Sequence, residues 1–179
     1  MRRKTTIHRI YVRQTAGDPA RGRLHAGAVV VPCMLGPGGM TQDKREGDGA
    51  TPCGSFVLAT IWFRDRTRHA AMPGWPWQRI RRDDIWCDAK GHALYNRPSR
   101  LPLAASHERL WREDHVYDVI LVLNHNSRPR RQGRGSAIFF HLARSPPAPT
   151  AGCVAISPAA MRRLLPRLAA GTTILITRQ

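Results

Sequence analysis

Lysine and acidic residues are scarce in this sequence. Only Lys4, Lys44 and Lys90 are lysines among the 29 Lys and Arg residues, and Asp and Glu together number 12, so the 179-residue chain has a formal net charge of +17. This balance excludes an acidic, solvating protein and makes arginine the main carrier of charge. It predicts attraction to polyanions such as nucleic acid, an anionic wall polymer or an anionic membrane surface.

Long apolar runs are absent as well, so we expect no membrane-spanning segment. Residues 1–4 are basic, but residues 5–13 alternate polar and apolar side chains as a strand does. The apolar core of a secretory signal peptide does not follow them. We therefore expect no signal peptide in this chain.

Paired cysteines of the kind that bind zinc are also missing. Cys33, Cys53, Cys87 and Cys153 show no C-x-x-C spacing, so we expect no metal site and no cofactor despite the eight histidines. If Cys153 is kept reduced as a reactive thiol, the other three cysteines can form at most one internal disulfide. The sequence leaves open whether one forms.

Length and composition favour one compact domain over residues 1–179. The 15 glycines and 14 prolines indicate many turns and short elements, which disfavours a helical bundle. Runs of β-branched and aromatic residues predict a mainly β protein. The predicted strands cover residues 7–13, 28–33, 56–63, 116–123, 136–141, 153–157 and 172–177.

One helix is well signalled near the C-terminus. Ser157 can cap its first turn, Pro158 suits the first helical position and Gly171 can end it. Helical spacing joins Met161, Leu164, Leu165 and Leu168. We predict a second, weaker helix over 104–112, and an irregular insertion or lid over 64–102.

The most informative pattern is a histidine followed, twelve residues later, by a cysteine. His141 ends the apolar run Phe139-Phe140, and Cys153 follows a glycine at the start of another predicted strand. A cysteine attacks carbonyls as its thiolate, and a nearby imidazole can take its proton. Gly152 permits a tight turn whose backbone N–H groups can face a developing oxyanion. The pair predicts a thiol nucleophile with a general base.

This segment resembles the L,D-transpeptidase catalytic domain, the YkuD-like family, whose signature places a histidine ahead of Ser/Thr-x-Gly-Cys. His141, Thr150, Gly152 and Cys153 match that signature. The resemblance implies a β-sandwich-like fold, mainly β with minor α, carrying a C-terminal helix and strand. It also implies that His141 is the general acid and base, Cys153 the nucleophile and Gly152 part of the oxyanion-binding turn.

Two positions depart from the family pattern and indicate a divergent subgroup. Ala151 stands where the family often has His or Arg, and Ala155 stands where it usually has Arg or Asn. Residues 51–56, Thr-Pro-Cys-Gly-Ser-Phe, are similar to a turn found upstream in these domains. Further candidates for substrate binding lie beside the predicted strands and in the middle of the chain: Thr150, Asn124, His125, Ser136, Trp86 and Tyr95.

The resemblance implies a peptidoglycan L,D-transpeptidase that cross-links stem peptides through a cysteine acyl-enzyme. The donor bond would join a diamino acid to D-Ala, or be another L,D bond such as L-Ala to D-Glu. An L,D-carboxypeptidase or amidase on the same fold is an alternative. Carbapenems would be covalent inhibitors, and the substrate would place the enzyme in the periplasm or cell wall.

A basic nucleic-acid-binding module is an alternative of another class. The positive charge suits contact with a nucleic-acid backbone, and the five tryptophans suit stacking against bases. No helix-turn-helix, RNA-binding aromatic signature or zinc finger accompanies them, so we expect no specific nucleic-acid partner.

Overall fold

The computed structural model describes residues 5–65 and 74–178 and is mainly β. Its strands are β1 (Ile7–Thr15), β2 (Asp18–Ala26), β3 (Val29–Met34), β4 (Met40–Thr41), β5 (Thr51–Pro52), β6 (Gly54–Phe63), β7 (Trp77–Arg79), β8 (Asp84–Cys87), β9 (Arg97–Arg100), β10 (His107–Arg109), β11 (Val119–Leu123), β12 (Phe139–Leu142), β13 (Val154–Ile156) and β14 (Leu168–Thr177). Within the described residues the single α-helix is α1 (Pro158–Leu164), which a 3₁₀ turn, η2 (Leu165–Arg167), continues. The mainly β class with a short C-terminal helix and a final strand is confirmed.

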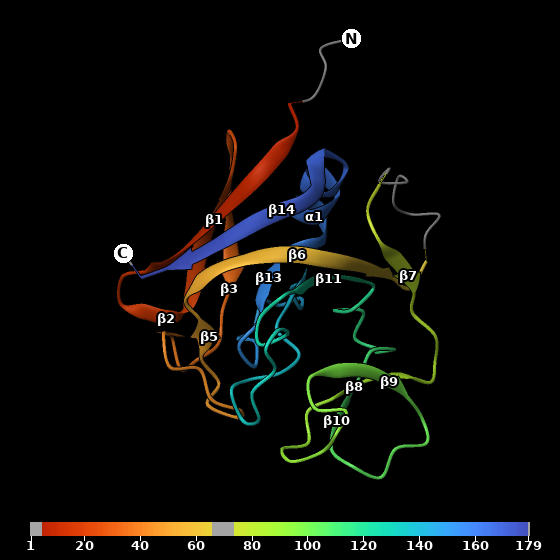
Figure 1. Ribbon diagram of the computed structural model, residues 1–179. Coiled ribbons are helices and arrows are strands. Elements are labelled where there is room, and N and C mark those ends of the chain that lie inside the picture. The colour runs from red at the N-terminus through yellow and green to blue at the C-terminus, as the bar shows by residue number, and fades with distance from the viewer. Residues whose placement is uncertain (1–4, 66–73, 179) are drawn as a thin grey trace.

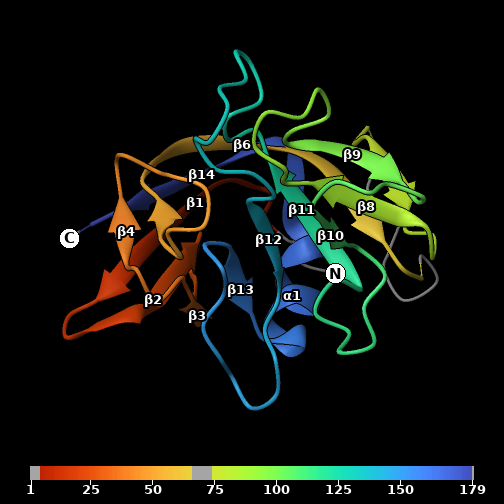
Figure 2. The ribbon, with the colours of Figure 1, turned by 90° about the horizontal axis from the view of Figure 1, so that it is seen from below.

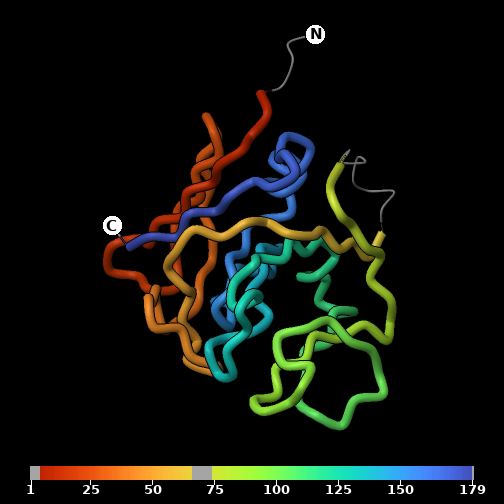
Figure 3. Tube along the Cα trace, in the orientation of Figure 1, coloured from red at the N-terminus to blue at the C-terminus, as the bar shows by residue number. Residues whose placement is uncertain are grey.

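The main sheet closes on itself. Its nine strands follow the order β11-β12-β13-β3-β2-β1-β14-β6-β7, and β6 also pairs with β11 (Figure 1). Only β7 lies outside the closed circuit. A separate sheet in the order β10-β8-β9 lies to one side, and β4 pairs with β5. The first and last strands, β1 and β14, run parallel to each other (Figure 3).

Alternating side chains build the core of this closed sheet. In β1 the apolar Ile10 and Val12 are buried, whereas Tyr11 and Arg13 between and after them are exposed. This period of two is what a strand requires when only one face is covered. The inward residues of the sheet and the apolar face of α1, including Met161 and Leu164, form one buried cluster.

Strand β11 is buried on both faces. Leu121 packs into the main cluster, while Ile120 and Val122 belong to a second cluster with Trp62 and Trp86. The small sheet carries Trp86 and covers the outer face of β11 and β12 at this point (Figure 2). Complete burial of β11 therefore follows from two layers packing against it.

The C-terminal helix begins as predicted but ends early. The Ser157 hydroxyl accepts a hydrogen bond from the Ala160 N–H at 3.2 Å, and α1 ends at Leu164. Pro166 lacks the N–H that would continue the α-helical ladder, so the chain passes through η2 into β14. The prediction that Gly171 ends the helix was wrong, because Gly171 lies within β14 with φ of 76°.

Two other predictions need correction. Residues 104–112 form no helix, since β10 occupies His107–Arg109 and pairs with β8. The stretch 64–102 is not irregular throughout, because β7, β8 and β9 lie in it; residues 66–73 of it are outside the described part. Strand pairing decides the structure of both segments, because β10 and β9 pair with β8 in the small sheet and β7 pairs with β6 in the main sheet.

Candidate functional site

Strand β12 delivers His141 to the second cluster. Side chains alternate along the strand, so Phe140 points into the main core while Phe139 lies on the face shared with His141. Strand β13 runs parallel to β12, with His141 opposite Ala155. Cys153 immediately precedes β13 and packs in the same second cluster as Phe139. The two strands thus present the histidine and the cysteine on one side of the sheet.

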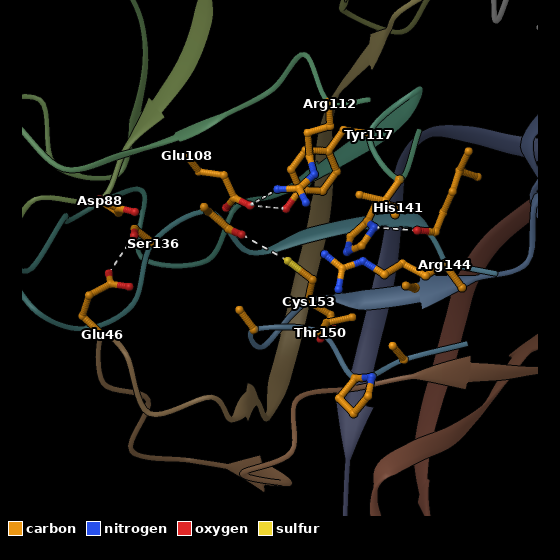
Figure 4. Close-up of a pocket in the computed structure, with 18 residues that line it drawn as sticks. Glu46, Asp88, Glu108, Arg112, Tyr117, Ser136, His141, Arg144, Thr150 and Cys153 are labelled. Atoms are coloured by element: carbon orange, nitrogen blue, oxygen red, sulfur yellow. Dashed lines mark hydrogen bonds and ion pairs between the residues drawn. The ribbon is translucent and has the colours of Figure 1, made fainter. Parts of the chain in front are cut away.

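Both side chains line a cavity of about 460 Å³. Figure 4 shows the sulfur of Cys153 and the ring of His141 in the middle of it. The cavity is lined by Glu46, Asp88, Glu108, Arg112, Val116, Tyr117, Ser136, Ala137, His141, Leu142, Ala143, Arg144, Ala148, Pro149, Thr150, Ala151, Cys153 and Ala155. Most of its polar groups are ionisable, so the cavity suits a charged ligand.

The Cys153 thiol is held between two backbone groups. It donates to the Ala137 carbonyl at 3.2 Å and accepts from the Phe139 N–H at 3.3 Å. Ala137 has a φ of 51°, which a non-glycine residue rarely adopts. Burial raises the pKa of the Cys153 thiol to about 12, with Glu108 adding to the rise. At neutral pH the Cys153 side chain is therefore a thiol and not a thiolate.

His141 lines the same cavity, and a backbone hydrogen bond fixes the orientation of its ring. Its Nδ1 lies 2.9 Å from the Leu142 carbonyl, which only accepts, so in the neutral ring Nδ1 carries the proton and Nε2 the lone pair. The imidazole ring packs against the Tyr117 ring in a T-shaped arrangement, with a centroid distance of 5.0 Å and an interplanar angle of 87°. Burial lowers the pKa of His141 to about 4. At neutral pH the imidazole is uncharged and can accept a proton.

We expect the free energy of unfolding of His141→Asn to depend less on acid pH than that of the original protein. Between pH 6.5 and about 4 the unfolded chain binds a proton at this histidine and the folded protein does not, so stability falls as the pH falls through that window. The shift in pKa corresponds to about 3 kcal/mol. The asparagine amide can still donate to Leu142, which preserves the local hydrogen bond.

The measurement is urea denaturation of both proteins at about pH 7 and about pH 4. The loss in the free energy of unfolding between those two conditions should be smaller in His141→Asn by about 3 kcal/mol. Equal losses in the two proteins would mean that His141 titrates in the folded state as it does in the unfolded chain.

The turn before Cys153 is closed by Thr150. The Thr150 hydroxyl donates to the Cys153 carbonyl at 2.7 Å and accepts from the Gly152 N–H at 3.2 Å. Gly152 has a φ of 124°, and a Cβ there would lie 2.6 Å from the Ala50 carbonyl oxygen. Because the Gly152 N–H is engaged, the Cys153 N–H is the better candidate for an oxyanion donor.

The order of these elements, a strand ending in His141 and a Thr-x-Gly-Cys turn entering the next strand, is matched by a known family. The sequence model described as the L,D-transpeptidase catalytic domain matches residues 9–176. The chain belongs to the L,D-transpeptidase catalytic domain family. Members of this family are cysteine-dependent L,D-transpeptidases. A search of the curated proteins found no match.

The L,D-transpeptidase domain brings together some of the residues predicted to bind substrate. Thr150 and Ser136 line the cavity. Tyr95 lies behind it and donates from its hydroxyl to Glu46 Oε2 at 2.6 Å. Trp86 is not among the lining residues; its Nε1 donates to Asn96 Oδ1 at 2.9 Å in the second cluster.

Asn124 and His125 are also not among the lining residues and have structural contacts. Asn124 Oδ1 accepts from the Val57 N–H at 2.8 Å, which ties the end of β11 to β6. His125 Nε2 donates to the Arg134 carbonyl at 2.9 Å, and its ring packs edge-on against Phe56. In this geometry both side chains fix the loop after β11.

Five charged or phenolic residues of the cavity were not predicted from the sequence: Glu46, Glu108, Arg112, Tyr117 and Arg144. They come from separate loops and from the ends of the small sheet, so no local spacing joins them. The one available signal was scarcity, because acidic residues are few in a chain of charge +17. The few acidic residues of so basic a chain are candidates for specific roles.

The structure adds three facts about the L,D-transpeptidase domain. All four cysteines are free, so no disulfide joins Cys33, Cys53 or Cys87. Among residues 5–65 and 74–178, no group of three or more His, Cys, Asp or Glu residues could hold a metal ion. The same residues include no helix long and apolar enough to cross a membrane.

Proposed function

We propose that this L,D-transpeptidase cross-links peptidoglycan stem peptides through an acyl-enzyme on Cys153. The observation that carries the proposal is a buried thiol and an uncharged imidazole in one cavity, the imidazole on β12 and the thiol directly before the parallel strand β13. With the thiol protonated and His141 neutral, proton transfer can accompany attack when the substrate arrives.

In the first step, Cys153 Sγ attacks the carbonyl of an L-residue that is linked to a D-residue. The thiol proton passes to Nε2 of His141, and the backbone N–H of Cys153 stabilises the oxyanion. The C–N bond then breaks, the D-residue leaves as an amine, and His141 returns the proton to it. A thioester remains on Cys153.

In the second step, an amine of a neighbouring stem attacks the thioester carbonyl. The C–S bond breaks, the amine gives a proton to His141, and the thiol is restored as the new amide forms. Water as acceptor would give a carboxypeptidase or amidase product. The donor bond is a diamino acid to D-Ala, or another L,D bond such as L-Ala to D-Glu.

We also propose that the enzyme acts in the periplasm or cell wall, where such stem peptides occur. An exposed basic face supports contact with an anionic wall or membrane surface. Arg13 of β1 lies directly opposite Arg23 of β2, and both are exposed and without an ion pair among the described residues. Like charges in direct cross-strand register destabilise each other and attract an anionic partner.

The test is incubation of the purified protein with defined muropeptides, followed by mass spectrometry of products and enzyme. We expect a cross-linked dimer and a thioester on Cys153. Hydrolysed monomer without dimer would identify the carboxypeptidase or amidase alternative. No change in the peptides and no adduct, over several L,D donor bonds, would contradict the proposal.

A carbapenem provides an independent probe of the same step, because the family is generally sensitive to carbapenems. The strained lactam carbonyl should acylate Cys153 and add the inhibitor mass to the protein. Peptide mapping should find the adduct on Cys153 and not on Cys53, a half-buried free thiol that does not line the cavity. Modification of Cys53 alone would count against Cys153 as the nucleophile.

A further inference from the structure

Lys44 is a buried cation that the proposed reaction does not use. Its side chain is 5% exposed, whereas Lys90, the other lysine that the structure describes, lies on the surface. Lys44 is not among the residues that line the cavity, so it does not contact the substrate. A lysine is rarely buried unless its charge is paired and its place in the structure matters, so a specific role is indicated.

The ammonium group of Lys44 is anchored in the loop that follows it. Nζ donates to the Asp48 carboxylate and, at 2.8 Å, to the Arg45 carbonyl. Asp48 also accepts from the N–H groups of Arg45 and Ala50, each at 2.8 Å. Burial alone would raise the pKa of the Asp48 carboxyl, but these hydrogen bonds outweigh burial and the pKa is lowered. The carboxylate is therefore charged at neutral pH and fixes the far end of the lysine side chain.

Two glycines border the methylene stem of Lys44. A Cβ at Gly135 would lie 2.8 Å from Lys44 Cγ, and a Cβ at Gly152 would lie 3.5 Å from Lys44 Cε. Both glycines have a positive φ, 89° and 124°, so a side chain is disfavoured at each of them. The stem thus lies beside Gly135 near its base and beside Gly152 near its tip.

The same two backbone segments hold the Cys153 thiol. Gly152 directly precedes Cys153 in the chain, and Ala137, two residues after Gly135, has the carbonyl that accepts from the thiol at 3.2 Å. The φ of 51° at Ala137 is uncommon for a residue with a side chain and needs support from its surroundings. A shift of either segment therefore changes where the thiol points.

The anchoring loop also reaches the cysteine turn through its backbone. The Ala50 carbonyl oxygen would lie 2.6 Å from a Cβ at Gly152, and the Ala50 N–H is one of the groups that Asp48 binds. The ion pair of Lys44 and Asp48 therefore supports the position of Gly152 in two ways, through the lysine stem and through Ala50.

We propose that Lys44 is a positioning residue for acyl transfer, whose anchored stem sets the spacing between Gly135 and Gly152 and so aims the Cys153 thiol. The inference rests on the proposed function, because that thiol is taken to be the nucleophile. A misplaced nucleophile slows the attack, whereas substrate binding is unaffected because Lys44 does not line the cavity. In this role the length of the stem matters most, and the charge serves to anchor it.

The test compares Lys44→Ala with Lys44→Met. Both substitutions remove the same positive charge from beside Asp48, but methionine keeps an unbranched side chain of similar length. Lys90→Ala is the control for the loss of a lysine on the surface. The first measurement is the rate of thioester formation on Cys153 at increasing concentrations of a donor stem peptide.

We expect Lys44→Ala to lower the maximal rate of thioester formation about 10²-fold, with the half-saturating donor concentration within about twofold of the original. Lys44→Met should keep the maximal rate within about fivefold of the original, and Lys90→Ala within about twofold. Equal maximal rates in Lys44→Ala and Lys44→Met would overturn the inference. So would a change in the half-saturating concentration alone.

Alkylation by iodoacetamide, followed by peptide mapping, reports on the thiol without any substrate. Truncation of the stem loosens the contacts of the thiol with its backbone partners, so Cys153 should react about fivefold faster in Lys44→Ala than in Lys44→Met. Cys33, a buried thiol of the main core, should react equally slowly in both variants. Faster reaction of both cysteines would mean that the whole domain is loosened, and would contradict a local role.

Gly135→Ala disturbs the same stem and keeps the inference testable if Lys44→Ala does not fold. The added Cβ would lie 2.8 Å from Lys44 Cγ and 3.0 Å from His125 Nε2. In the control Gly133→Ala, also at a positive φ, 72°, the nearest atom is Lys90 Cδ at 4.0 Å. We expect Gly135→Ala to lower the maximal rate about tenfold and Gly133→Ala less than about twofold. Equal rates in the two glycine variants would count against the role of the stem.

Failure of this inference can be told apart from failure of the proposed function. Selective alkylation of Cys153 in Lys44→Ala, without a thioester in the original protein, would contradict the proposed function alone. A thioester in the original protein, with equal rates and equal alkylation in the two Lys44 variants, would contradict this inference alone.

Discussion

Cys153→Ala is expected to lower the rate of cross-link formation by more than about 10³-fold. The alanine has no nucleophile, so no thioester can form, and the remaining cavity can only bind the peptide. The Cys153 side chain is 5% exposed and its loss leaves a small space in the second cluster, so the variant should still fold. The measurement is the dimer formed per unit time from a defined stem peptide, with near-ultraviolet circular dichroism as the check on folding.

Cys53→Ala is the matched control for that variant. Cys53 is also a free thiol, half-buried and packed against the main core, but it does not line the cavity. Its replacement should leave the rate of cross-linking within about twofold of the original. A folded Cys153→Ala protein with an unchanged rate would exclude the acyl-enzyme mechanism.

Gly152→Ala is expected to reduce both stability and activity. Its φ of 124° is a backbone conformation that side chains rarely adopt, and the added Cβ would lie 2.6 Å from the Ala50 carbonyl oxygen. Strain and overlap together should lower the free energy of unfolding by about 3 kcal/mol. Displacement of the Cys153 N–H from the oxyanion should cost about 10²-fold in rate. Urea denaturation and the muropeptide assay measure the two effects.

Gly91→Ala separates backbone strain from steric overlap as causes of the lost stability. Gly91 also has a positive φ, 83°, but nothing lies within 4 Å of a Cβ built there. Its replacement should cost about 1 kcal/mol, from the backbone alone, with activity unchanged. Equal losses of stability in the two variants would show that the backbone near Ala50 moves aside, and that Gly152 is not required for close approach.

Strand alternation and helix capping, which act within a few residues, were enough to predict some strands and the start of the helix. The strand around residues 56–63 appears as β6, and Ser157-Pro158 starts α1, because alternation and capping act within a few residues. The family resemblance, carried by four residues between His141 and Cys153, is confirmed over residues 9–176. The roles of those four residues stay predictions until the variants are measured.

The parts that were missed depend on partners outside the segment itself. Strand β2 contains no β-branched or aromatic residue and has weak strand propensity, yet β1 and β3 pair with it on both sides. The lining of the cavity combines residue 46 with residues 88 and 108, which only the folded chain brings together. Local sequence patterns cannot join them, because 20 to 62 positions separate these three residues along the chain.

The connection from β12 to β13 bears on how this enzyme could change over evolution. Parallel neighbours are usually joined by a helix, but here residues 143–153 cross over as a loop, visible in Figure 2. The strand register keeps His141 opposite Ala155 whatever the loop contains, while Arg144, Pro149 and Ala151 from the loop line the cavity. Residues 143–149, which precede the turn from Thr150 to Cys153, can therefore vary by insertion or substitution while the strand register and that turn are kept, and we expect exchange of this stretch between relatives to change substrate preference.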